Sequence, residues 1–246
     1  MKTIILAAGY ATRLYPLTEN FPKPLLPVGD KAILDWLVED IQEDTEEIIL
    51  VSNHKFAHIF SEWAKDKEKL QVYDDGTGTN ETRLGAVKDI LLAVRKAHIH
   101  EDVLVMAGDN MLDFSLKGFI RYARSSGASC VMCHEENDLS RLRKTAVISM
   151  DQDGLITSYE EKPRDPKGHF AVPPFYYYKK EHLPFLETAM DEGCNPDAPG
   201  SFAAWLSHRV PMKAYLMPGK RYDIGDRESY EQVKQLWLHR TCQAQN

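Results

Sequence analysis

The chain has 246 residues and a formal net charge of −7 at pH 7. This length suits one large α/β domain with a substantial core, although two smaller domains also fit it. The negative charge argues against a nucleic-acid binder, because polyphosphate backbones recruit basic faces. No apolar stretch reaches membrane-spanning length and the first apolar run is too short for a secretion signal, so we expect a cytoplasmic protein.

The cysteines point to buried structural residues rather than to a disulfide framework or a metal site. They are few and scattered, at Cys130, Cys133, Cys194 and Cys242. Cys130 and Cys133 have CxxC spacing, but they belong to an apolar run typical of a strand, on which residues three apart face opposite sides. No second CxxC accompanies them.

The amino-terminal segment predicts a buried strand followed by an anion-binding loop. Residues 3–8 are apolar or β-branched without alternation, as in a parallel strand covered on both faces. Gly9 allows a tight turn at the carboxyl end of this strand, where open α/β sheets bind ligands. Arg13 and Lys23 follow on a proline-rich segment with little backbone freedom, so they offer fixed positive charge.

This loop is neither of the two familiar phosphate loops, since it contains no GxxxxGK[ST] and no GxGxxG. It resembles instead the signature LAAGxGTRLxPLTxxxPKPLLPV of the nucleotidyltransferases that make nucleoside diphosphate sugars. The matching residues are Leu6, Ala7, Ala8, Gly9, Thr12, Arg13, Leu14, Pro16, Leu17, Thr18, Pro22, Lys23, Pro24 and Val28. Ala11 departs from it by replacing a glycine, which costs about 1 kcal/mol if the position needs a positive φ.

The resemblance implies a fold and a domain organisation. It predicts an α/β protein with a doubly wound mixed sheet, Rossmann-like and similar to the GT-A type. We expect a single domain over residues 1–246, with a nucleotide-binding half (1–127) and an acceptor-binding half (128–246). The chain ends without the hexapeptide repeats of bifunctional relatives, so no carboxyl-terminal β-helix is expected.

The nucleotide-binding half alternates between predicted strands and helices. A helix is expected over 32–41 with Asp30 as its N-cap, strands over 47–52 and 69–73, and a helix starting near residue 84. His54 and His58 are four residues apart, as in a metal pair. Position 55 is a lysine rather than the glutamate of HExxH, so a solvated helix face explains them better.

Several positions in this half resemble nucleotide contacts of the family. Leu84-Gly85-Ala86 is similar to its LGT[AG] segment, which places Gly85 near the base and leaves Asn80, Glu81 or Thr82 to read the base edge. The resemblance therefore implies nucleotide contacts from Leu6, Ala7, Ala8, Gly9, Asn80, Gly85 and Asp109. Which base is read stays open.

Two carboxylates are candidates for holding Mg²⁺. Asp109 follows the predicted strand 102–107, and a carboxylate at a strand's carboxyl end beside a phosphate loop is suited to Mg²⁺. It matches the family's GD pair. Residues 221–225 resemble the late W-x-D-x-G element, which makes Asp223 the second metal ligand. Asp226 is expected to cap a closing helix over 226–237.

The acceptor-binding half is expected to be rich in strands, over 128–133, 146–150 and 156–161, with a hairpin turn at Asp153-Gly154. By resemblance to the family's EEKP motif, Glu161 contacts the acceptor sugar and Lys162 its phosphate. The aromatic run 175–178 is expected to alternate between core and surface on a strand. The alternative is that some of these rings, Tyr176 among them, bind the acceptor and could hold a cationic headgroup such as choline.

Together these residues predict Mg²⁺-dependent transfer of a nucleotidyl group from a nucleoside triphosphate to a sugar 1-phosphate. Arg13 would stabilise the departing pyrophosphate, Lys23 would contact the phosphates at the reacting centre, and Lys162 would attract the acceptor phosphate. One alternative is a cytidylyltransferase for phosphocholine or a phosphonate. Another is a catalytically silent subunit that senses a nucleotide sugar. The oligomeric state, including a homo-oligomer, stays open.

Overall fold

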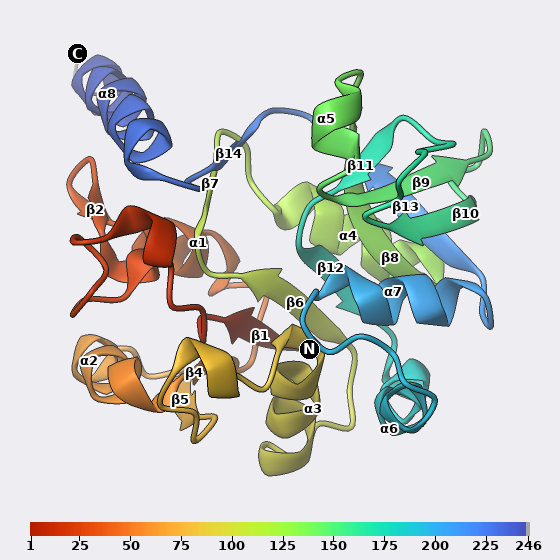
Figure 1. Cartoon of the computed structure of the whole chain (residues 1–246), viewed down its shortest axis with the longest axis horizontal. Helices are drawn as coiled ribbons and strands as arrows, with labels where there is room; N and C mark the ends of the chain where they lie inside the picture. The colour runs from red at the N-terminus through yellow and green to blue at the C-terminus, as the bar shows by residue number, and fades with distance from the viewer. Residues whose placement is uncertain (245–246) are drawn as a thin grey trace.

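Parallel pairing of four neighbouring strands forms the centre of the fold (Figure 1). The computed structural model describes residues 1–244, with side chains described to residue 238. The main sheet contains β1 (Lys2–Leu6), β4 (Ile48–Ser52), β5 (Leu70–Asp74), β6 (Val103–Ala107), β8 (Ser129–Glu135), β9 (Ala146–Met150), β10 (Ile156–Glu161), β11 (Phe170–Val172), β12 (Phe175–Tyr178) and β13 (Met212–Leu216). Two small ribbons pair β2 (Pro27–Val28) with β3 (Lys31–Ala32) and β7 (Asn110–Leu112) with β14 (Arg221–Asp223).

The helices connect these strands and cover the sheet. They are α1 (Ile33–Ile41), α2 (His54–Ala64), α3 (Ala86–Lys96), α4 (Lys117–Ser126), α5 (Leu139–Leu142), α6 (Phe185–Asp191), α7 (Gly200–Ser207) and α8 (Arg227–Ala244). Within the described chain, none is long and apolar enough to span a bilayer.

The sheet is mixed, as predicted. Its order is β10-β9-β11-β8-β12-β6-β1-β4-β5, with β13 also paired to β8. The strands β5, β4, β1 and β6 run parallel, whereas β12 pairs antiparallel with both β6 and β8. Strand β12 therefore joins the parallel part of the sheet to the part built from later residues.

Alternate residues of each central strand enter two different cores, since side chains of a strand point to opposite faces. Ile4 of β1 packs in the core covered by α3, α6 and α7, whereas Ile5 packs in the core covered by α1, α2 and α4. Burial on both faces explains why these strands are apolar without alternation. Cys130 and Cys133 are free and buried, as predicted, whereas the side chain of Cys242 lies outside the described part of the chain.

The aromatic run on β12 corrects one prediction. All four residues of Phe175–Tyr178 are buried, so none alternates to the surface. Tyr176 and Tyr178 lie in one core and Phe175 and Tyr177 in the other, because β12 is an interior strand of the sheet. The side chains of β12 therefore alternate between two faces of the sheet as predicted for a strand, but a core covers each face.

Two helix ends also differ from the sequence-based expectation. Asp30 does not cap α1, because Lys31 and Ala32 stay extended in the β2–β3 ribbon and the helix begins at Ile33. Asp35 instead accepts a hydrogen bond from the backbone N–H of Ala32 (3.1 Å). Asp226 caps α8 as predicted, by accepting from the N–H of Ser229 (2.9 Å), but the helix extends to Ala244.

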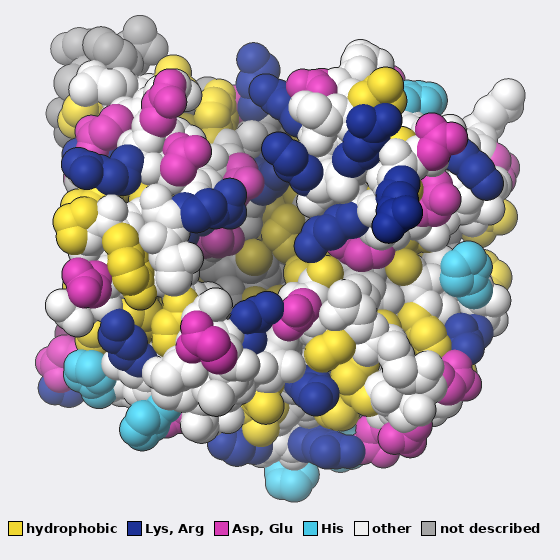
Figure 2. Space-filling model, viewed as in Figure 1, with side chains coloured by type: hydrophobic (Ala, Val, Ile, Leu, Met, Phe, Trp, Pro, Cys, Tyr) yellow, Lys and Arg dark blue, Asp and Glu magenta, His cyan; other side chains and the backbone are white. Residues whose placement is uncertain are grey.

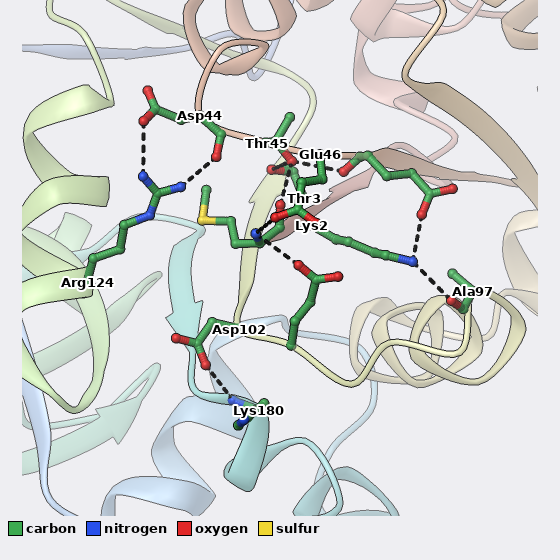
Figure 3. Close-up of polar contacts among 12 residues, drawn as sticks. Lys2, Thr3, Asp44, Thr45, Glu46, Ala97, Asp102, Arg124 and Lys180 are labelled. Carbon is green, nitrogen blue, oxygen red and sulfur yellow. Dashed lines mark hydrogen bonds and ion pairs between the residues drawn. The ribbon is translucent and has the colours of Figure 1, made fainter.

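Asp102 forms several polar contacts at the edge of the sheet opposite the loop that follows β1, and Figure 3 shows the one with Lys180. Its carboxylate accepts hydrogen bonds from Tyr177 Oη (2.9 Å), Lys179 Nζ (2.7 Å) and the backbone N–H of Lys180 (2.9 Å). Burial opposes ionisation, but these donors outweigh it, so the pKa of Asp102 is lowered. The network fixes β6 against the chain that follows β12.

We expect Asp102→Asn to lower the free energy of unfolding by about 1–3 kcal/mol at pH 7, because it removes a charge that several donors share. A carboxyl with a lowered native pKa stabilises the fold above its unfolded pKa of 3.8, and this stabilisation is lost as the pH falls through the native pKa. Urea unfolding of both proteins from pH 7 to pH 3 measures the difference. A difference that does not shrink below pH 4 would contradict this account.

Candidate active site

A cavity opens at the carboxyl ends of β1 and β6, where the predicted phosphate loop begins. Its volume is about 360 Å³. Figure 2 shows a hollow in the middle of the viewed face with Lys and Arg side chains on either side of it. The cavity is lined by Leu6, Ala7, Ala8, Gly9, Ala11, Arg13, Leu14, Lys23, Pro24, Asp75, Asn80, Arg83, Gly85, Ala86, Asp89, Ala107, Asp109, Asp197 and Gly225.

All the residues predicted to contact the nucleotide line this one cavity, together with Arg13 and Lys23. They come from parts of the chain up to about a hundred residues apart, such as Leu6 and Asp109. The reason is strand pairing. Leu6 of β1 pairs with Ala107 of β6, so the segments that follow these two strands leave the sheet at the same edge. Four predicted residues, Lys162, Glu161, Tyr176 and Asp223, do not line the cavity.

The phosphate loop is held in shape by its backbone and by α8. Ala11 has φ 48° and ψ 41°, the left-handed conformation in which glycine is preferred. Its carbonyl accepts a hydrogen bond from the buried hydroxyl of Thr18 (2.8 Å). Leu14 and Leu26 of the loop pack with Tyr230 and other residues of α8 in a separate small core. The carboxyl-terminal helix therefore supports the loop that carries Arg13 and Lys23.

A chain of ion pairs and hydrogen bonds joins the loop to the predicted metal ligands. Lys23, only 7% exposed, places Nζ 2.8 Å from Oδ2 of Asp109. Asn110 donates from Nδ2 to Oδ1 of Asp109 (3.1 Å) and accepts from Arg221 Nη1 (2.7 Å). Burial opposes ionisation of Asp109, but Lys23 and Arg221 outweigh it and lower the pKa of that carboxyl. Asp109 is thus an anion at neutral pH.

Asp223 lies beside Asp109 through the ribbon of β7 and β14. In this ribbon Asp223 pairs with Asn110, the residue that follows Asp109. Arg13 is close as well, because its Nη1 lies 3.9 Å from where a Cβ on Gly225 would be. The three side chains predicted to act on one triphosphate therefore belong to one region of the molecule.

The residues around Asp109 and Asp223 fit a magnesium ion that also binds phosphate. Mg²⁺ is held by one or two carboxylates together with substrate phosphates, rather than by a cage of protein ligands. The described residues contain no group of three or more acidic, cysteine or histidine side chains that could form such a cage. Asp109, whose Oδ2 lies 2.8 Å from Nζ of Lys23, and Asp223, which pairs with Asn110, are the carboxylates that would hold a metal bound to a triphosphate.

Two of the three predicted acceptor residues, Glu161 and Tyr176, lie together at the start of α7. Oε2 of Glu161 and the hydroxyl of Tyr176 both approach Gly200, where an added Cβ would be 2.3 Å and 3.3 Å from these atoms. Oε2 of Glu161 is buried without a hydrogen-bond partner among the described residues, and burial raises the pKa of this carboxyl. Lys162 is exposed and has a positive φ of 48°, a strained backbone for a lysine.

Gly85 has a structural reason to be glycine. Its φ is 91°, and an added Cβ would lie 2.6 Å from the carbonyl oxygen of Pro196. The backbone of Pro196 also accepts a hydrogen bond from the N–H of Val87 (2.9 Å). Gly85 therefore lets the segment before α7 pack closely over the start of α3, beside the cavity.

Sequence reasoning missed several charged and polar residues of the site. They are Asp75, Arg83, Asp89, Asn110, Asp197 and Arg221. Arg221 could have been found, because it is two residues before Asp223 on a strand and so shares its face. Asp89 also left a signal, as an acidic residue on the buried side of the α3 helix. The ion pair of Arg83 with Asp197 (3.0 Å) joins residues far apart in sequence, and no local pattern reveals it.

Comparison with known proteins agrees with the fold. The family model described as "Nucleotidyl transferase" matches residues 2–240. "Bifunctional protein GlmU" of Methanococcus aeolicus is 31% identical over 192 residues, covering 76% of this chain and 42% of the relative. "UTP--glucose-1-phosphate uridylyltransferase AglF" of Haloferax volcanii is 26% identical over 254 residues, covering 99% of both chains.

Among solved structures, a UDP-glucose pyrophosphorylase complexed with UDP-glucose superposes with a TM-score of 0.79 at 22% identity, covering 97% of this chain and 98% of the other. At this identity the likeness establishes the fold. The chain belongs to the nucleotidyl transferase family, which confirms the family resemblance of its phosphate loop. It spans less than half the length of the GlmU relative.

We expect Ala11→Gly to raise the free energy of unfolding by about 0.5–1 kcal/mol, because glycine adopts the left-handed conformation without a steric cost. Chemical denaturation measures the change. Ala57→Gly in α2 is the matched control, since a glycine within a helix should destabilise the protein by about 1 kcal/mol. Equal destabilisation by both substitutions would show that the loop is not strained at Ala11.

Proposed function

We propose that the protein transfers a nucleotidyl group from a nucleoside triphosphate to a sugar 1-phosphate, forming a nucleoside diphosphate sugar and releasing pyrophosphate. The observation that carries this proposal is the single region that contains Arg13, Lys23 and Asp109, with Asp223 on the neighbouring strand. Fixed cations and carboxylates in one region are what phosphoryl chemistry on a metal-bound triphosphate requires.

The reaction needs no protein nucleophile. An oxygen of the acceptor phosphate attacks the α-phosphorus, a new P–O bond forms, and the bond to the pyrophosphate oxygen breaks with its electrons leaving on pyrophosphate. The phosphate monoester is already an anion at neutral pH, so alignment and charge neutralisation suffice. Mg²⁺ held by Asp109 and Asp223 would neutralise negative charge on the triphosphate.

The cations of this chain would each act at a different place. Lys23 is buried and fixed by Asp109, so it is placed to contact the phosphates at the reacting centre. Arg13 is exposed at the cavity, where it can stabilise the departing pyrophosphate. Lys162 follows Glu161 at the edge of the acceptor region and would attract the acceptor phosphate.

A sugar phosphate fits the acceptor region better than phosphocholine does. The unpartnered Oε2 of Glu161 can accept a hydrogen bond from a sugar hydroxyl. A choline headgroup would need an open aromatic face. The aromatic residues of β12 are at most 2% exposed, and the ring of Tyr176 stacks on that of Tyr178 with centroids 5.9 Å apart. Tyr176 therefore contributes its hydroxyl, beside Glu161, to the proposed acceptor region.

The activity is tested with purified protein, Mg²⁺, each nucleoside triphosphate in turn, and a panel of sugar 1-phosphates together with phosphocholine. Pyrophosphate release with a sugar 1-phosphate supports the proposal. Loss of this release when Mg²⁺ is chelated supports the need for the metal. Release only with phosphocholine would favour a cytidylyltransferase. Nucleotide binding that does not depend on Mg²⁺, with no turnover in any combination, would favour a silent sensing subunit.

Lys23→Met should lower kcat about a hundredfold, because it removes one preorganised charge from the reacting centre. Steady-state rates of pyrophosphate release measure this change. Lys117→Met is the control, since Lys117 is exposed on α4 and forms its ion pair with Glu43 on the surface. A rate for Lys23→Met within a few fold of the control would remove Lys23 from the mechanism.

Glu161→Gln should raise KM for the sugar 1-phosphate about tenfold and leave KM for the triphosphate unchanged, because a charged acceptor for a sugar hydroxyl is lost. The matched control is Glu160→Gln, whose side chain points to the other face of β10. Initial rates at varied concentrations of each substrate separate the two constants. An equal rise in both constants would instead indicate a general disturbance of the site.

A further inference from the structure

One end of the cavity is acidic, in contrast to the end that carries Arg13 and Lys23. Asp75, Asp89 and Asp197 line it together with Gly85, the residue that the family resemblance places near the base. Asp89 lies in the first turn of α3, and its N–H donates to the carbonyl of Gly85 (3.0 Å). The carboxyl of Asp89 therefore belongs to the same part of the cavity as Gly85.

Asp89 is buried in this cavity without a hydrogen-bond partner for one of its oxygens. The residue is 4% exposed, and Oδ1 has no partner among the described residues. Burial, with a smaller contribution from the nearby carboxylate of Asp75, raises the pKa of Asp89 to about 7. A carboxyl in this environment destabilises the fold unless a donor reaches it. No described side chain supplies that donor to Oδ1.

Asp75, near Asp89, also has a buried carboxylate oxygen without a hydrogen-bond partner among the described residues. Its Oδ1 accepts hydrogen bonds from the N–H (2.6 Å) and the hydroxyl (2.7 Å) of Thr77, whereas its Oδ2 is buried without a partner among the described residues. The cationic Arg83 is turned to Asp197 (3.0 Å) and to the carbonyl of Asn80 (2.8 Å). Two residues that line the cavity, Asp75 and Asp89, thus each keep a buried carboxylate oxygen without a hydrogen-bond partner among the described residues.

A ligand that complements the whole cavity must be anionic at one end and a hydrogen-bond donor at the other. A nucleoside triphosphate meets this condition only if its base carries donors. Cytosine, guanine and adenine each have an exocyclic amino group with two N–H donors, whereas the pairing edge of uracil and thymine offers one donor, N3–H, between two carbonyl oxygens, which a carboxylate repels. A site built of acceptors rejects a base that lacks the matching donor, because its own buried oxygens are then left unpaired.

We propose that Asp89, with Asp75 beside it, determines base specificity by accepting a hydrogen bond from the exocyclic amino group of the base, so that the protein prefers cytosine, guanine or adenine nucleotides to uracil and thymine nucleotides. This inference rests on the proposed function, since it assumes that the triphosphate binds with its base at Gly85. It assigns to Asp89 a role in specificity rather than in the chemical step.

The test measures nucleotide binding by calorimetry and pyrophosphate release as kcat/KM, for CTP, GTP, ATP, UTP and dTTP with Mg²⁺. At least one amino-bearing nucleotide should exceed UTP and dTTP by roughly ten- to a hundredfold in affinity and in kcat/KM. The three amino-bearing nucleotides are separate arms, so the result identifies which base is read. A preference for UTP or dTTP would overturn the inference.

The variants Asp89→Ala and Asp89→Asn should reduce the preference for the amino-bearing nucleotide over UTP at least tenfold. The affinity and kcat/KM for UTP should change least. Asp153→Asn, in the exposed hairpin turn, is the control and should keep the preference. An equal loss of affinity and kcat/KM for all five nucleotides would show that Asp89 has a structural role and would overturn the inference. Thermal unfolding of each variant reports its folding; if both Asp89 variants fail to fold, the nucleotide preference of the unmodified protein still decides the question.

The same measurements separate this inference from the proposed function. Selective binding of an amino-bearing nucleotide without pyrophosphate release with any acceptor would refute the activity and leave the base preference standing. Turnover with UTP or dTTP as the preferred nucleotide would refute the base preference and leave the activity standing. Failure to bind any of the five nucleotides would refute both.

Discussion

The site depends on the parallel pairing of β1 with β6, which brings two loops to one edge of the sheet. Leu6 and Ala107 are paired at the ends of these strands, so the phosphate loop and Asp109 leave the sheet side by side. The ion pair between Lys23 and Asp109 (2.8 Å) then fixes the loop against the segment that follows β6. Lys23 is buried and the side chain of Asp109 is 37% exposed, so this pair is less screened than an ion pair between two fully exposed side chains.

The carboxyl-terminal part of the chain also contributes residues and packing to the site. Strand β14 adds Asp223 and Arg221 beside Asn110, and α8 packs its apolar side chains against the phosphate loop. Residues near the two ends of the chain thus stabilise one site, as in the hydrogen bond from the hydroxyl of Tyr230 to the carbonyl of Pro27 (2.8 Å). The position of Lys23 follows from this packing as much as from its own loop.

The cavity also carries a difference in charge along its length. Arg13 and Lys23 mark one end, whereas Asp75 and Asp89 supply unpaired acceptor oxygens at the other. This polarity distinguishes the part of a ligand that is held by charge from the part that is selected by hydrogen bonding. The base preference that we propose for this chain differs from the uridylyl transfer for which one relative, AglF of Haloferax volcanii, is named.

The sequence by itself determined the family, the mixed α/β fold and the residues of the phosphate loop, because a long motif and unbroken apolar strands are local signals. It also indicated Asp109, which follows a strand directly. Only the tertiary structure decided that the aromatic residues of β12 are all buried, since their burial depends on strands β6 and β8 on either side. It alone revealed the network through Asn110 and Arg221 and the unpaired Asp89, because hydrogen bonds between distant segments, and the lack of them, leave no pattern along the chain.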